Sequence, residues 1–250
     1  MRYFVQFSYF GEAYHGWQNQ PNAITVQSVM EDVFSKLTGR PIALVGAGRT
    51  DTGVHARQMY AHFEVDVEID IEDLVYRTNA FLPQDIAIQA ILRVAPDAHA
   101  RFDAVARTYE YWIVRDKDPF MARVSHYIKH PLDVRKMNEA ASMLLEYTEF
   151  ECFSKSNTDV KTYRCKITLA HWEQKNGVLV FTITADRFLR NMVRAIVGTL
   201  LEIGAGKWEP VQMQSIIGSR DRSLAGASVP AKGLYLTKVL YPDHIFEKNG

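Results

Sequence analysis

Hydrophobic and polar positions in residues 1–104 follow periods that predict three strands separated by two helices. Residues 3–9 alternate between the two kinds of side chain, which is the period of a strand. Thr25 and Gly39 are suitable residues for the start and end of the first helix. Asp70 is suited to begin the second helix, which ends before Pro83. The predicted strands are 3–9, 59–65 and 86–94.

The remaining residues repeat this theme with elements of other lengths. Asn176-Gly177 predicts a tight turn that joins two antiparallel strands. We expect an α+β fold in which two pseudo-repeated α/β units, residues 1–104 and 105–250, place helices on a mainly antiparallel sheet. The predicted strands are 108–114, 163–172, 178–184 and 235–239, and the predicted helices are 133–147, about 187–203 and 210–217.

Composition places the chain among ordinary globular proteins. It has 250 residues, of which 47% are hydrophobic and 23% charged, and this excludes collagen and argues against disorder and membrane spans. Cys152 and Cys165 are too far apart for a Cys-x-x-Cys pair. Without a pattern typical of a signal peptide, we expect a cytoplasmic protein that does not bind a membrane.

Charge is balanced overall but is distributed unevenly. The chain has 29 basic and 29 acidic residues. Residues 1–104 contain 8 Lys and Arg against 13 Asp and Glu, so their formal charge is −5 and that of the rest is +5. The second half is therefore the side on which to search for a polyanion-binding surface.

The segment Gly-Ala-Gly-Arg-Thr-Asp-Thr-Gly-Val-His-Ala, residues 46–56, has neither a helical nor a strand period. Such a loop allows close approach of the backbone to a ligand, although a tight turn with a surface Arg–Asp pair has the same pattern. A dinucleotide-binding fingerprint is excluded because Asp51 replaces its third glycine. A Walker loop is excluded because Val54 and His55 stand where it needs Lys and Ser or Thr.

Asp51-Thr52-Gly53 also matches the triplet of aspartic proteases, which need two such aspartates. The chain contains one, so a protease would have to be a dimer, and Arg49 favours an ionised Asp51 over a shared proton. The eight histidines follow no metal-binding pattern, and we expect His55 and His62 either to be structural or to face solvent, so we expect no metal. What remains is a carboxylate that can act as nucleophile or base.

Two basic patterns in the second half could contact an anion. Arg107, Tyr109 and Tyr111 share one face of a predicted strand, which either binds a base and a phosphate or contributes core tyrosines. The spacing i, i+3, i+7 predicts a basic stripe on an otherwise apolar helix, formed by Arg187, Arg190 and Arg194. An arginine in a buried helix needs an anionic partner, for which Asp51 is a candidate.

Residues 48–56 resemble the catalytic signature of the tRNA pseudouridine synthase A (TruA) family. The similarity extends over nearly the whole chain and follows the family's order. Seven further segments carry it: residues 14–18, 27–28, 79–83, 100–104, 107–111, 188–194 and 233–236. The loop from Lys155 to Lys161 is less distinctive.

The resemblance implies a homodimeric isomerase with a two-part α/β architecture and a basic cleft. It would convert uridine to pseudouridine at positions 38, 39 and 40 of the tRNA anticodon stem-loop without a cofactor. The matching residues are Asp51 as nucleophile, Tyr109 as the ring on the target base, Arg194 as partner of the aspartate, Arg49 as the residue that helps move the base, and Leu236, or Leu234 instead, as an apolar wall.

The residue types fit this chemistry because isomerisation moves one uracil from an N1 to a C5 linkage and needs no outside reactant. A carboxylate near C1′ can form an adduct or remove a sugar proton, and both mechanisms stay open. Arg107, Arg187 and Arg190 would bind the RNA. Two other functions also stay open, namely a non-catalytic RNA-binding module, which has no use for Asp51, and a dimeric aspartic protease, which has no use for RNA.

Overall fold

The computed structural model describes residues 1–155 and 161–247. They form two compact units: unit 1 comprises Met1–Ala106 and Leu236–Gly250, and unit 2 comprises Arg107–Tyr235. The first boundary lies two residues from the division expected after residue 104. The C-terminal residues from Leu236 onward, however, return to unit 1, because their strand and the turn after it pack on the sheet of that unit.

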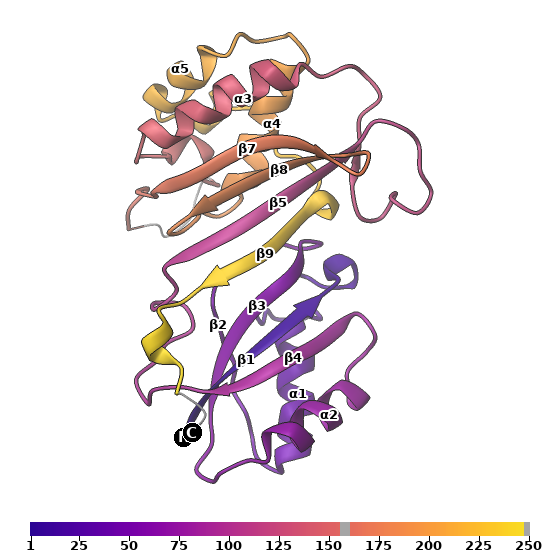
Figure 1. Cartoon of the computed structure of the whole chain (residues 1–250), viewed down its shortest axis with the longest axis vertical. Coiled ribbons are helices and arrows are strands. Elements are labelled where there is room, and N and C mark those ends of the chain that lie inside the picture. The colour runs from indigo at the N-terminus through magenta and orange to yellow at the C-terminus, as the bar shows by residue number, and fades with distance from the viewer. Residues whose placement is uncertain (156–160, 248–250) are drawn as a thin grey trace. The chain divides into compact units, whose positions relative to one another are not determined.

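Unit 1 is built on a sheet in which β1 is paired with β3 on one side and with β4 on the other, both antiparallel (Figure 1). A short strand, β2, adds to β3. Two helices, α1 and α2, contact each other, and α2 also contacts β4. The bounds are β1 Arg2–Tyr9, β2 Val45–Gly46, β3 His55–Glu64, β4 Ile86–Arg93, α1 Val26–Thr38 and α2 Ile71–Phe81.

The expected helix ends are confirmed in unit 1. The Thr25 side chain accepts a hydrogen bond from the Ser28 backbone N–H. The Ser28 hydroxyl in turn accepts from the Thr25 backbone N–H, and the two bonds form a capping box. Gly39 ends α1 with φ = 69°, in the left-handed region that glycine tolerates best. Asp70 caps α2 by accepting from the Asp73 N–H.

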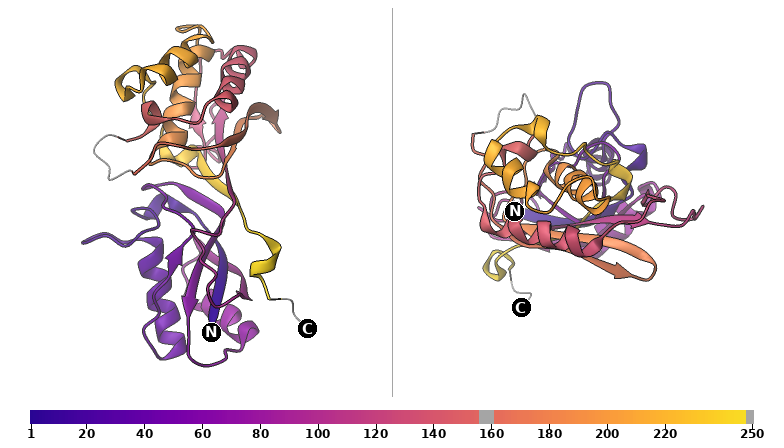
Figure 2. Two further views of the ribbon diagram at one scale, coloured as in Figure 1. Left: turned by 90° about the vertical axis from the view of Figure 1, so that its left-hand side faces the viewer. Right: turned by 90° about the horizontal axis from the view of Figure 1, so that it is seen from above.

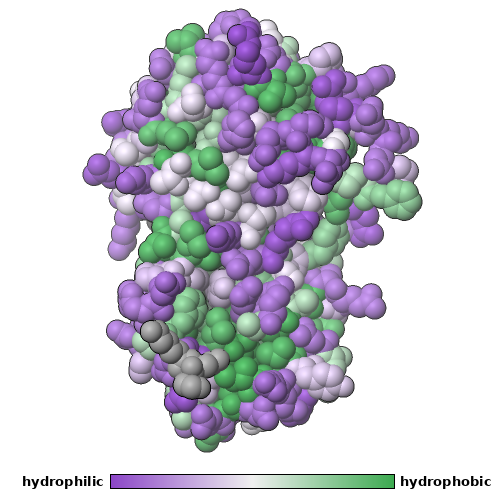
Figure 3. All heavy atoms as spheres, in the orientation of Figure 1, coloured by the Kyte–Doolittle hydropathy of each residue, from purple (hydrophilic) through white to green (hydrophobic). Residues whose placement is uncertain are grey.

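The sheet of unit 1 is covered on both faces. On one face, Phe34 of α1 packs edge-on against Phe63 of β3, with 5.3 Å between ring centroids. On the other, Phe4 contacts Tyr241 and Phe246 of the segment that follows β9. Figure 2 shows α1 and this C-terminal segment on opposite sides of the sheet. Apolar side chains gather on the second face over the strands of unit 1 (Figure 3).

Unit 2 contributes the antiparallel strands β5-β8-β7 to the sheet, in that order, with β6 beside β5 as a parallel exception. Asn176 and Gly177 both have positive φ and form the expected hairpin turn between β7 and β8. Asn138 of α3 bonds to the backbone N–H and C=O of Trp172 in β7, which holds the helix on the sheet. The bounds are β5 Ala106–Val114, β6 His126–Tyr127, β7 Ile167–Lys175, β8 Val178–Ala185, α3 Val134–Met143, α4 Met192–Gly204 and α5 Gln212–Ser219.

The final strand, β9 Leu234–Leu240, spans the boundary between the units. The α+β class, with helices packed on a mainly antiparallel sheet, is confirmed. No helix among residues 1–155 and 161–247 has both the length and the apolar content needed to cross a bilayer.

Three predicted elements start four or more residues from the expected position. The strands expected from residues 59 and 163 begin at His55 and Ile167, and the third element is a helix. The helix expected from about residue 187 begins at Met192, because Asn191 has φ = 67° and this left-handed backbone interrupts helical hydrogen bonding. Arg187 and Arg190 therefore lie before α4, and the predicted helical stripe of three arginines does not exist. Only Arg194 is on the helix.

Candidate active site

Asp51 lies on the loop between β2 and β3, with a half-buried side chain. The Asp51 C=O accepts a hydrogen bond from the Val54 N–H at 3.1 Å, which closes a turn around the aspartate, and Gly53 has φ = 77° inside it. On the N-terminal side, the Thr50 hydroxyl bonds to the Tyr9 hydroxyl at 2.8 Å. The backbone on both sides of the carboxylate is thus held, while Arg49 is exposed.

A second segment, residues 11–17, supports this loop through contacts that leave no room for a side chain. A Cβ on Gly16, where φ = 84°, would lie 2.2 Å from the Thr50 carbonyl oxygen, and one on Gly11 would lie 2.0 Å from that of Val54. Tyr14 C=O accepts from the Gly53 N–H at 3.3 Å. Residues 14–18 resemble the family, but the sequence alone predicts no role for them. In the structure, residues of this segment support the Asp51 loop.

The two histidines near the loop have structural roles, as expected. His55 is buried, stacks on Phe10 at 4.3 Å, and accepts a hydrogen bond from the Gly11 N–H through Nδ1 at 2.9 Å. His62 is also buried and accepts from the Ala100 N–H at 3.1 Å. Burial, with the nearby His99 and Arg2 charges, lowers the pKa of His62 to about 4, which keeps this acceptor neutral.

Tyr109 and Tyr111 share a face of β5 but differ in environment. Tyr111 is fully buried, and its hydroxyl donates to the Pro230 C=O at 2.9 Å, so it is a core residue. Burial raises the pKa of Tyr111, and the Arg194 charge opposes this rise. Tyr109 is half-buried and meets Phe188 edge-on at 5.2 Å. Of the two interpretations of this face, Tyr111 fits that of a core tyrosine, while contact of Tyr109 with a base stays a prediction.

Arg194 occupies the first turn of α4 and is half-buried. Its Nε donates to the Val229 C=O at 2.7 Å, while the Val229 N–H donates to the Arg194 C=O at 3.2 Å. Two hydrogen bonds between the same residues fix both the backbone and the guanidinium. The Nη atoms are the donors with a geometry suited to a carboxylate.

Of the other predicted RNA-binding arginines, Arg107 lies at the start of β5, and Arg187 and Arg190 lie between β8 and α4. Arg107 Nη1 donates to the Asp186 C=O at 2.7 Å, and half-buried Arg187 reaches the Thr162 C=O at 3.4 Å. Arg190 is exposed, and its C=O accepts from the Lys155 N–H. Residues 156–160 of the loop that begins at Lys155 lie outside the described residues.

Leu234 and Leu236 are both buried, on one face of β9, so either can present an apolar surface. The structure thus places Asp51, Arg49 and Leu236 in unit 1, and Tyr109, Arg194 and the other arginines in unit 2.

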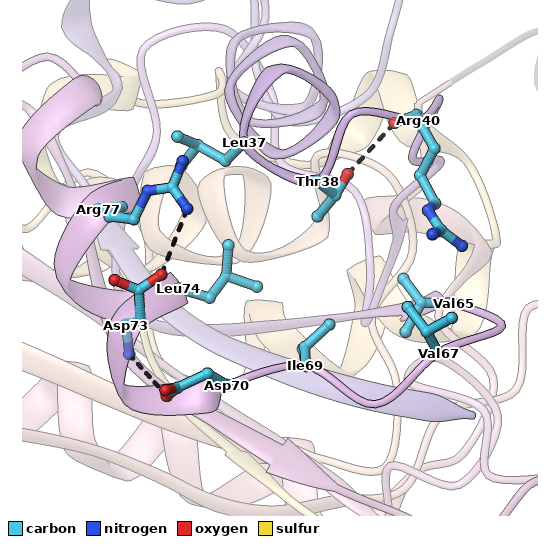
Figure 4. Close-up of a pocket in the computed structure, with 10 residues that line it drawn as sticks. All are labelled: Leu37, Thr38, Arg40, Val65, Val67, Ile69, Asp70, Asp73, Leu74 and Arg77. Carbon is cyan, nitrogen blue, oxygen red and sulfur yellow. Dashed lines mark hydrogen bonds and ion pairs between the residues drawn. The ribbon is translucent and has the colours of Figure 1, made fainter.

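A pocket of about 140 Å³ in unit 1 contains none of the predicted site residues (Figure 4). It lies between the end of α1, the segment after β3 and the start of α2. Its arginines are already paired, Arg77 with Asp73 at 3.3 Å and Arg40 with Asp66 at 3.6 Å, and Asp70 caps α2. Among the described residues, no group of three or more His, Cys, Asp and Glu side chains is arranged to hold a metal ion.

Comparison with known proteins gives consistent matches. The family model described as tRNA pseudouridine synthase matches residues 6–103 and 140–242. A protein named tRNA pseudouridine synthase A from Bacteroides fragilis is 50% identical over 98% of this chain and 98% of its own length. Proteins of the same name are 49% identical in Porphyromonas gingivalis, over 98% of this chain and 99% of the relative, and 41% identical in Acetivibrio thermocellus, over 93% and 96%.

Proposed function

This chain belongs to the tRNA pseudouridine synthase family, and on that premise we propose that it isomerises uridine to pseudouridine at positions 38, 39 and 40 of the tRNA anticodon stem-loop. The observation that carries the proposal is the Asp51 loop, where a half-buried carboxylate is held by backbone contacts on a segment that matches the family's catalytic signature. The enzyme class is therefore isomerase.

In this reaction the N1–C1′ bond of uridine breaks, a C5–C1′ bond forms, the C5 proton leaves and N1 gains a proton. We propose that Asp51 acts on the sugar, either by attack on C1′ or by removal of a neighbouring proton. The hydrogen-bonded turn around Asp51 favours this role, because a catalytic group must keep its geometry to within a fraction of an ångström.

Arg194 is proposed to pair with Asp51 and keep it ionised and oriented. Its Nε bond to Val229 supports this role, since a guanidinium held at one nitrogen presents the Nη atoms in a fixed plane. Tyr109 is proposed to stack on the target uracil, and its half-buried ring, oriented by Phe188, is suited to that contact. Leu236 would add an apolar wall.

A base within a stem cannot reach a half-buried carboxylate, so the target nucleotide has to leave its stack. We assign this step to Arg49, which is exposed beside Asp51. The cost of unstacking, about a few kcal/mol, would be offset by phosphate contacts to Arg107, Arg187 and Arg190. Recognition then depends mainly on RNA shape and backbone charge.

The protein is further proposed to act as a cytoplasmic homodimer without metal or cofactor, as the resemblance implies. Light scattering would test the dimer, and full activity after treatment with a chelator would support the metal-free reaction. Neither result bears on the role of Asp51.

The experiment that tests the function is release of tritium from unmodified tRNA labelled at uridine C5, because the C5 proton is lost only when the new bond forms. We expect release by the wild type and none by Asp51→Ala. Release by both would remove Asp51 from the mechanism. Absence of release by the wild type, with tRNA binding intact, would instead favour a non-catalytic RNA-binding module, and peptide cleavage at acidic pH would favour the protease.

A further inference from the structure

Residues 225–230, here the 225–230 segment, run along α4 and end beside β5. The segment has no helical or strand structure of its own. Near its end, Val229 makes both hydrogen bonds to Arg194, through its N–H and its C=O. The position of the Arg194 guanidinium therefore depends on the position of this segment.

One stripe of α4 forms the contact with the segment. Arg194 and Gly198 are spaced i, i+4 and so share a helical face, and Asn191 immediately precedes the helix. A Cβ on Gly198 would lie 1.8 Å from the Ala227 carbonyl oxygen, so the backbones touch at this point. The Gly226 N–H donates to the Thr199 hydroxyl at 2.9 Å, inside the fully buried part of the helix.

Arg222 holds the beginning and the middle of the segment. Its Nη1 donates to the Ala225 and Gly226 carbonyl oxygens at 3.4 and 3.1 Å, and its Nη2 donates to the Ser228 hydroxyl at 2.9 Å. The same hydroxyl accepts from Asn191 Nδ2 at 2.5 Å. One half-buried guanidinium thus joins the turn after α5 to the residue that precedes α4.

The end of the segment is attached to β5. The Tyr111 hydroxyl donates to the Pro230 C=O, and Tyr111 lies two residues beyond Tyr109 on the same face of the strand. The 225–230 segment therefore connects the helix that carries Arg194 with the strand that carries Tyr109.

We propose that Arg222 is a positioning residue for the isomerisation, which holds the 225–230 segment and through it the guanidinium of Arg194. This inference rests on the proposed role of Arg194. Charged donors make stronger hydrogen bonds than neutral ones, so one arginine can hold three acceptors in a segment without secondary structure. Ser228 transmits the contact to Asn191 and acts in the same way.

An alternative role for Arg222 is direct contact with RNA. Arg222 also lines a polar hollow of about 690 Å³ together with Lys155, Tyr163 and Arg220. The two roles predict different kinetics, because a positioning residue alters the chemical step whereas an RNA contact alters binding.

The test measures kcat, KM and tRNA affinity for Arg222→Gln, with Arg220→Gln as the matched control. Arg220 lies in the same turn and is exposed, so its replacement removes the same charge. We expect kcat of Arg222→Gln to fall about tenfold with KM and Kd within about twofold of wild type, and Arg220→Gln to be unchanged. A rise in KM and Kd with unchanged kcat would overturn the positioning role in favour of an RNA contact.

A double-mutant cycle with Arg194→Lys then asks whether Arg222 acts through Arg194. Single-turnover rates with excess enzyme allow slow variants to be measured. We expect Arg222→Gln to cost about tenfold in the wild-type background and less than about twofold in the Arg194→Lys background. Equal losses in both backgrounds would contradict the proposal.

Two further variants keep the test decisive if Arg222→Gln does not fold. Arg222→Lys retains the charge but can reach fewer acceptors, and Ser228→Ala removes a single acceptor, so both should lower kcat by a smaller factor. Full kcat in both would overturn the inference. Wild type is measured in the same assay: its inactivity would refute the proposed function, whereas an active wild type with fully active variants would refute only the positioning role.

Discussion

The Asp51 loop and the start of α4 are held in place by different kinds of contact. Asp51 depends on backbone approaching backbone, at Gly11 and Gly16, where any side chain would collide with a carbonyl oxygen. Arg194 depends on hydrogen bonds with Val229, 35 residues later in the chain, in a segment that is itself held by Arg222. Substitutions near Asp51 should therefore cause large losses of activity, whereas substitutions around Arg194 should lower activity by smaller, graded factors.

The largest effect is expected from Asp51→Asn, which keeps the shape of the side chain but removes its charge. The turnover rate should fall by about 10³-fold or more, with Kd for tRNA nearly unchanged, because the carboxylate acts in the chemical step. Asp97→Asn, an exposed substitution in the same unit, is the control. Substantial residual turnover would show that the Asp51 carboxylate is not needed for the chemical step, and the comparison between the Asp51 loop and the start of α4 would lose its basis.

Gly16→Ala tests the backbone support directly. Gly16 and Gly39 both have positive φ, but a Cβ on Gly16 meets Thr50 whereas one on Gly39 has nothing within 4 Å. We expect Gly39→Ala to cost about 1 kcal/mol of stability with normal activity. Gly16→Ala should cost more than this and lower turnover by about 10²-fold, because a misplaced catalytic group loses activity steeply. Thermal melts and turnover of the two variants give the comparison, and equal activities would contradict it.

Acid should weaken unit 1 through His62. Its pKa lies at about 4 in the folded protein against 6.5 in the unfolded chain, so the unfolded state binds the proton first. Stability from this group is complete above pH 6.5 and is lost as the pH falls toward 4, by about 3 kcal/mol. His62→Gln should flatten the dependence of unfolding free energy on pH over this interval. If the unfolding free energy of His62→Gln depends on pH as steeply as that of the wild type, groups other than His62 cause the dependence.

The smallest effects are expected from Arg187→Gln and Arg190→Gln, which precede α4. Each should weaken tRNA binding by a few fold and reduce the slope of log Kd against log salt by about one. The control is Arg77→Gln in unit 1, because Arg77 is paired with Asp73. Unchanged slopes would mean that these arginines, like Arg222, hold protein rather than RNA.

Sequence patterns were most informative where the structure depends on near neighbours. The caps at Thr25 and Asp70, the left-handed Gly39 and the Asn176-Gly177 turn are all local, and all are confirmed. The start of α4 was wrong because the arginine spacing continues a helical period through residue 187, while the left-handed conformation of Asn191 has no hydrophobic signature. Asparagine tolerates that conformation, but its presence alone does not predict it.

The sequence by itself determined most of the longer elements, the Asp51 motif and the family to which the chain belongs, because these follow from local pattern and contiguous residue identity. Only the tertiary structure decided that residues 11–17 support the Asp51 loop and that the 225–230 segment holds Arg194. The difference between Tyr109 and Tyr111 was also visible only in the tertiary structure. Strand alternation assigns both side chains to one face, but only packing makes Tyr111 part of the core. Contacts between segments distant in the chain depend on how the elements pack, which no local period encodes.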